Sequence, residues 1–125
     1  MPSIQEPLNL GDLLKYEAPN LYSRDLATVA AGQSLLLGTV VGRDPATGKL
    51  SPIAPSAVDS SAEAVGVLAT DIDATLIDRE DALLIARHAM VASQSLVWPA
   101  GITPAQKAAA ILQLQARGVL VRTAA

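Results

Sequence analysis

The feature that most constrains the fold is the stretch from Glu63 to Val91, in which two apolar runs enclose an acidic segment. The runs, Ala64–Ala69 and Ala82–Ala86, have the length of strands and are rich in valine, isoleucine and leucine. The segment between them carries four aspartates and one glutamate, which cannot enter a core without partners. We therefore expect a strand, a solvent-exposed loop and a second strand at the centre of a small β-rich domain.

Turn-forming residues separate further short strands, which we expect at Leu26–Val29, Ser34–Val41 and Lys49–Ile53. Gly38 inside the second of these indicates a bulge or a close approach by another backbone. The run Ala82–Ala86 is apolar at every position and is expected to continue as a strand to Ala92. The loss of alternation predicts that both faces of this strand are covered, and in so small a domain the second cover could be another subunit.

One helix is predicted near the C-terminus. Thr103 is a suitable N-cap, Pro104 occupies the first helical position, and Gln106 completes a capping box. Gly118 is the expected stop, followed by a short closing strand, Val119–Val121. Together with the strands, this predicts an α+β fold: a small, barrel-like or sandwich-like β-rich domain with one C-terminal helix and an extended N-terminal arm.

The N-terminal residues differ from the rest, because prolines interrupt them and their leucines are irregularly spaced. Such a segment is either a disordered terminus or an arm that becomes ordered against a partner. The leucines favour the arm, since a purely solvated tail has no use for them. We divide the chain into a flexible arm, residues 1–21, and one domain, residues 22–125. The anchor candidates in the arm are Leu8, Leu10, Leu13 and Leu14.

Composition excludes several classes of function. The chain has 125 residues, which suits one domain, and it has no phenylalanine, one tryptophan and two tyrosines, so its core must be aliphatic. The net charge is −3 and the basic residues are scattered, which disfavours nucleic acid and anionic membranes as partners. Without cysteine, disulfides and thiolate sites are excluded. No membrane span or secretory signal is expected, and no cofactor is implied.

The acidic segment contains one tempting catalytic pattern. Asp71, Asp73 and Thr75 follow an apolar strand in the DxDxT spacing of haloacid-dehalogenase-type phosphatases, which use Mg²⁺. The resemblance covers only those five positions, and the rest of the chain is too short for that α/β fold. The alternative is a solvated turn with local side-chain-to-backbone hydrogen bonds. A calcium loop of the EF-hand type would need a glycine at its sharp turn and flanking helices, which are missing.

Two single residues also require interpretation. His88 is the only histidine, and no GxSxG motif or second metal ligand accompanies it, so a surface or interface position fits better than catalysis. Trp98 precedes a proline and is expected to be either a core anchor or a residue at a subunit boundary. At a subunit interface we expect His88, Trp98 and Leu84, which lies in the apolar strand. We expect no catalytic residue, no metal site and no enzymatic activity.

From about Gly11 to Arg122 the chain resembles the lambda-type bacteriophage head decoration proteins, which are also called capsid-stabilising or cementing proteins. The resemblance rests on the order and spacing of short motifs over nearly the whole chain. These are Gly11-Asp12-Leu13-Leu14, Ser23-Arg24-Asp25, Ala31-Gly32-Gln33, Leu37-Gly38-Thr39-Val40, Thr47-Gly48-Lys49, Ala64-Val65-Gly66-Val67-Leu68, Asp73-Ala74-Thr75, Leu96-Val97-Trp98-Pro99-Ala100-Gly101-Ile102-Thr103 and Gly118-Val119-Leu120-Val121-Arg122.

The resemblance implies a structural virion protein made in a bacterial host. It would sit as homotrimers at three-fold sites outside an icosahedral phage head and stabilise the expanded capsid against internal DNA pressure. Its arm would run onto the major capsid protein and add a strand to it. The alternatives are a β-rich assembly or scaffold module of another shell or tail, and a small Mg-dependent phosphatase acting through Asp71 and Asp73. The residues expected to bind the capsid are Leu8, Leu10, Leu13, Leu14, Tyr16, Tyr22 and Arg24.

Overall fold

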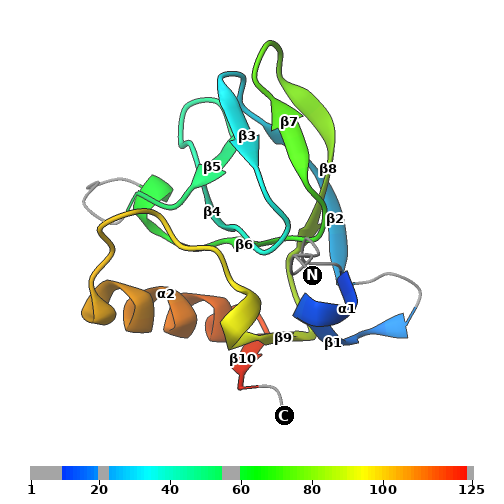
Figure 1. Cartoon of the computed structure of the whole chain (residues 1–125), viewed down its shortest axis with the longest axis vertical. Coiled ribbons are helices and arrows are strands. Elements are labelled where there is room, and N and C mark those ends of the chain that lie inside the picture. The colour runs from blue at the N-terminus through cyan, green and yellow to red at the C-terminus, as the bar shows by residue number, and fades with distance from the viewer. Residues whose placement is uncertain (1–9, 20–22, 55–59, 124–125) are drawn as a thin grey trace, which may run out of the picture.

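The computed structural model describes residues 10–19, 23–54 and 60–123 (Figure 1). The first half of the chain forms α1 (Leu10–Leu13), β1 (Leu14–Glu17), β2 (Arg24–Val29), β3 (Gln33–Leu35), β4 (Val40–Arg43) and β5 (Leu50–Pro52). The second half forms the 3₁₀ turn η2 (Ser60–Ala62), β6 (Gly66–Leu68), β7 (Ile72–Ala74), β8 (Arg79–Ile85), β9 (Ala89–Ala92), the 3₁₀ turn η3 (Ser93–Ser95), α2 (Pro104–Ala116) and β10 (Val119–Arg122). The predicted β-rich α+β class is confirmed.

The centre of the fold is a closed barrel of five strands in the order β2-β5-β4-β6-β8. Neighbouring barrel strands are antiparallel, except that β2 and β5 run parallel. The barrel interior holds one of two apolar cores. Its large members have essentially no solvent exposure, and they are Val29, Val41, Leu50, Leu68 and Leu84.

A second core lies between the barrel and a layer made of α2 and the sheet β1-β9-β10 (Figure 1). Because successive side chains of a strand point to opposite faces, Leu84 enters the barrel interior and Ile85 enters this second core. Both faces of β8 are therefore covered, as the sequence predicted. The second cover comes from the same chain rather than from another subunit, because α2 and the small sheet already occupy that face.

The predicted strand Ser34–Val41 is wrong as a single element. The structure contains β3 and β4 instead, separated by a turn in which Gly38 has φ = +94°. A Cβ on Gly38 would lie 2.2 Å from the carbonyl oxygen of Ser95, so the close backbone approach expected at this glycine is confirmed. Leu37 N donates to the Asp71 carboxylate at 2.6 Å, which joins the turn to the acidic segment.

The acidic segment itself is not entirely loop. β7 lies within it and pairs antiparallel with β3, with Ile72 and Ala74 buried and Asp73 exposed between them. The apolar residues at alternate positions supply the reason, since they allow a three-residue strand to bury one face. The connection from β7 to β8, residues 75–78, lies at one end of the molecule (Figure 1).

The predicted continuation of β8 to Ala92 is also wrong. The chain bends at residues 86–88, where His88 has φ = +48°, and β9 then starts in a different sheet. The bend lets β9 pair parallel with β10 and antiparallel with β1. Histidine is among the non-glycine residues that adopt a positive φ more often than others, but such residues remain uncommon there, so it is tertiary pairing that determines the break.

The C-terminal helix follows the prediction. Thr103 Oγ1 accepts a hydrogen bond from Gln106 N at 3.1 Å, and Gln106 Oε1 accepts one from Thr103 N at 2.9 Å, forming the capping box. The helix ends before Gly118, whose φ is +85°, and β10 follows. Within the described part of the chain, no helix is long and apolar enough to cross a membrane.

Candidate functional site

The first candidate surface is the free edge of β1. This strand is the outer member of the sheet β1-β9-β10, and among the described strands it pairs only with β9, Tyr16 lying opposite Met90 and Glu17 opposite Ala89. The backbone N–H and C=O groups along the edge of a sheet can pair with a strand of another chain. Tyr16 is 57% exposed beside this edge. The surface is therefore suited to recognition by strand addition.

The structure corrects part of the expected capsid-binding arm. Leu13 is completely buried in the second core, and Leu10 and Leu14 pack against that core. Ser95 Oγ donates to the carbonyl of Asp12 at 3.0 Å, which fixes α1 to the domain. Residues 10–17 thus belong to the folded domain, because their leucines complete its own core. Two of the expected arm residues, Leu8 and Tyr22, lie outside the described residues.

Arg24 also makes its strongest contacts within the chain. Its guanidinium donates to both carboxylate oxygens of Glu17 at 2.7 Å, which joins the end of β1 to the start of β2. The hydrogen bond from Arg24, with the charge attraction as a smaller contribution, lowers the pKa of Glu17, and the same contact raises the pKa of Arg24. Buried Ser23 lies beside this pair: its hydroxyl accepts from Ala18 N at 2.9 Å and donates to His88 O at 2.8 Å. These contacts hold the β1 edge on the barrel.

The second candidate surface is an apolar tip, which we define as Leu76 and Ile77 in the connection from β7 to β8. Leu76 is 91% exposed and Ile77 is 67% exposed. They border a surface hollow of about 640 Å³ together with Asp73, Thr75 and Arg79. This pair is not among the site residues predicted from the sequence, because the neighbouring carboxylates gave the more obvious chemical signal. The available signal was two adjacent large aliphatic residues inside an otherwise polar loop.

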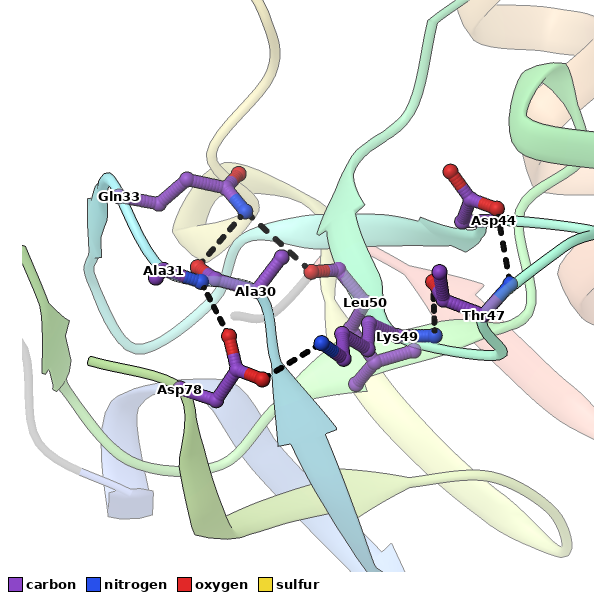
Figure 2. A network of polar contacts seen from close by, with 8 residues as sticks. All are labelled: Ala30, Ala31, Gln33, Asp44, Thr47, Lys49, Leu50 and Asp78. Atoms are coloured by element: carbon purple, nitrogen blue, oxygen red, sulfur yellow. Dashed lines mark hydrogen bonds and ion pairs between the residues drawn. The ribbon is translucent and has the colours of Figure 1, made fainter.

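A polar network holds the connection that carries the apolar tip (Figure 2). Asp78 accepts a hydrogen bond from Ala31 N at 2.8 Å and pairs with Lys49 Nζ at 2.6 Å. Gln33 continues the network by donating to the carbonyls of Ala30, at 3.1 Å, and Leu50, at 3.4 Å. These contacts lower the pKa of Asp78: the hydrogen bond from Lys49 contributes most, and the one from the backbone N–H of Ala31 contributes next. The tip is thus presented on a fixed loop.

Asp73 and Asp81, in the same segment, also have structural partners. Asp73 accepts hydrogen bonds from the backbone N–H and the hydroxyl of Thr75, which confirms the predicted local side-chain-to-backbone contact. Asp81 forms a two-bond pair with Arg79, at 2.8 and 3.0 Å. Among the described residues, no group of three or more histidine, aspartate or glutamate side chains is placed to hold a metal ion. Asp73 and Thr75 thus stabilise a local turn in this structure, whereas Asp71 joins the segment to Leu37.

We predict that Asp78→Asn loosens the loop in a pH-dependent way. The pKa of Asp78 lies below its ordinary 3.8, so the charged contact stabilises the fold above that value and is lost as the pH falls through the lowered pKa. Asp78→Asn should therefore melt at a lower temperature than wild type at about pH 7, and the difference should shrink as the pH falls below 3.8.

The measurement is thermal unfolding across this pH range. Glu80→Gln is the matched control, because it removes the same charge from an exposed position two residues away. Equal melting temperatures for the two variants at neutral pH would contradict a structural role for Asp78.

The third candidate surface is a cavity of about 490 Å³ near the bend between β8 and β9, at the end of the barrel away from the apolar tip. Leu84 and His88, two of the expected interface residues, both line it; Leu84 is almost fully buried and His88 is exposed. Trp98 does not line this cavity. Instead it packs, half-buried, against the second core, with Lys107 Nζ 6.0 Å from its ring centre. Participation of Leu84, His88 and Trp98 in a subunit interface stays a prediction.

Comparison with protein families gives one informative match. A family model described as "Bacteriophage lambda head decoration protein D" matches residues 3–119. The match covers nearly the whole chain, including the barrel, β1 and β9 of the small sheet, and the C-terminal helix. Comparison with curated proteins gave no match.

Proposed function

The chain belongs to the bacteriophage lambda head decoration protein family and is a structural protein of the outer surface of a phage head; on that premise, we propose that it binds as homotrimers at the three-fold sites of an icosahedral shell. There it stabilises the expanded capsid against the pressure of packaged DNA. Its partner is the major capsid protein, and its role is mechanical rather than catalytic.

The observation that carries this proposal is the position of β1. Among the described strands, it is at the edge of its sheet, and only the four residues of α1 separate it from residues 1–9. Here a capsid strand can add to the edge of β1, or the N-terminal segment of this chain can add to a capsid sheet. In either case the added strand gains backbone hydrogen bonds, and its alternate side chains enter pockets of the partner. Residues 1–9 contain Ile4 and Leu8 as apolar anchors for such a contact.

Trimer formation explains how weak individual contacts give firm attachment. After one arm of a trimer docks, the other two arms experience an effective concentration on the order of mM. Each docking segment loses conformational entropy of roughly 1–2 kcal/mol per ordered residue, which leucine burial and strand pairing must exceed. A trimer that contacts three neighbouring capsid subunits at once would therefore tie them together and oppose their separation.

The test is direct decoration of heads. We expect purified protein, mixed with expanded heads that lack a decoration protein, to appear in cryo-microscopy maps as three-lobed density on the outside of the three-fold sites. Decorated heads should also retain DNA at temperatures or chelator concentrations that rupture bare heads. Density at other positions, or single lobes at the three-fold sites, would contradict the proposed arrangement.

A further inference from the structure

We propose that the apolar tip of one copy docks into the cavity between β8 and β9 of the next copy, so that the two surfaces form the contact between trimer subunits. This inference rests on the proposed trimer and names the surfaces that build it. The partner in the cavity is a second copy of this chain, and the ligand is the Leu76–Ile77 loop with its flanking carboxylates.

The cavity has an apolar floor and a charged rim. Val65, Leu84 and Ala86 contribute the floor. Three arginines, Arg43, Arg87 and Arg117, lie around it together with His88, and they outnumber the two carboxylates, Asp25 and Glu63. Asp25 pairs with Arg87 at 2.5 Å and Glu63 lies 3.5 Å from Arg117, so the rim is already arranged by its own chain. Such a cavity fits an apolar group that is flanked by negative charge.

The apolar tip is an apolar group of this kind, with carboxylates on both sides. Its two large aliphatic side chains are largely exposed, although burial of such side chains is favourable. Exposed apolar residues on a loop that ordered contacts hold in place are typical of interaction surfaces. The contacts of Asp78 with Ala31 and Lys49 supply that order, and they limit the entropy lost when the loop docks.

The charges of the two surfaces are complementary. The segment from Asp71 to Asp81 carries five carboxylates, of which Asp78 pairs with Lys49 and Asp81 with Arg79. The other three leave a net negative charge beside the tip, whereas the cavity lining has one more arginine than carboxylates. Opposite potentials of this kind favour association and orient the partners, and they disfavour contacts of tip with tip, which would bring the acidic segments together. The tip of one copy therefore matches the cavity of another better than it matches a second tip.

The two surfaces cannot meet within one chain. The tip precedes Arg79 at the start of β8, whereas Leu84, Ala86 and Arg87 lie at or beyond its other end. Seven strand residues span roughly 20 Å at about 3.3 Å per residue. A contact between unlike surfaces of identical chains is heterologous, and it closes into a ring when the rotation between copies allows. A three-membered ring is the closed form that the proposed function requires.

The absence of cysteine from the chain allows a clean cross-linking experiment. We expect an equimolar mixture of Leu76→Cys and Ala86→Cys proteins, assembled on expanded heads and oxidised, to form a disulfide-linked dimer of unlike chains. A disulfide requires Cα atoms within about 7 Å, so its formation places the tip in the cavity. Leu112→Cys, at another exposed apolar position on α2, replaces Leu76→Cys in the control mixture and should give no cross-link.

The other outcomes separate this inference from the proposed function. Cross-links in Leu76→Cys protein alone would show that the tips meet each other, and decorated three-fold sites without a Leu76–Ala86 cross-link would show that trimers use other surfaces. Either result overturns the inference and leaves decoration intact, whereas heads without three-lobed density count against the proposed function itself. As a check without added cysteine, Leu76→Asp should weaken trimer formation at least tenfold while the folded protein melts as wild type. Undiminished trimer formation by this variant would also overturn the inference.

Discussion

Deletion of residues 1–9 will abolish head decoration and leave the melting temperature of the protein nearly unchanged. The described domain begins at Leu10, so this deletion removes no element of the barrel, the small sheet or α2. It does remove the proposed docking segment from each copy of a trimer. Since linked contacts multiply affinity by on the order of 10²–10⁴, losing all of them should lower the affinity for heads by at least about 100-fold.

A longer deletion is the informative comparison. Removing residues 1–17 also removes α1 and β1, which takes Leu13 from the second core and leaves one side of β9 unpaired. We expect that protein to unfold at a much lower temperature or to aggregate, because burial and strand pairing are lost together. Both proteins are compared by calorimetry and by co-sedimentation with expanded heads. Undiminished sedimentation of the shorter deletion with heads would show that residues 1–9 are not the docking segment.

Leu13→Ala will destabilise the domain by roughly 2–5 kcal/mol, the range for a large aliphatic side chain removed from a closed core. Leu13 has no solvent exposure, and it shares the second core with Ile85, Val91, Leu114 and Val119. The truncation leaves a cavity that α1 can fill only in part, because the Ser95–Asp12 hydrogen bond fixes it. Denaturant unfolding monitored by the single tryptophan measures the loss.

Leu112→Ala is the matched control, since Leu112 is 64% exposed on α2 and its truncation should change stability by less than about 0.5 kcal/mol. The Leu13 variant should also still decorate heads at a temperature where it remains folded. If it kept wild-type stability and instead lost decoration, Leu13 would be an anchor for the capsid and not a core residue.

Several elements could be predicted because their signals are local. The capping box at Thr103 and Gln106 fixes the start of α2 through contacts within four residues, and the apolar composition of Ala82–Ala86 indicates burial on both faces wherever the strand lies. The order of motifs also indicated the family, which the match over residues 3–119 shows. None of these conclusions requires knowledge of which segments lie next to each other.

The features that could not be predicted depend on contacts between distant segments. Leu13 has the same sequence context whether it anchors a partner or fills its own core, and the core position follows from its packing beside Val91 and Val119. Likewise, the bend at His88 follows from pairing of β9 with β10, some thirty residues later along the chain.

Capping, periodicity and motif order are properties of neighbouring residues, so the β-rich class, the helix and the family could be inferred before the fold was known. Which leucines are core, where β8 ends, and the placement of the apolar tip and the arginine-rimmed cavity at opposite ends of the barrel depend on long-range contacts. Burial and exposure are set by the closing of the barrel and the docking of the second layer, which no local pattern contains.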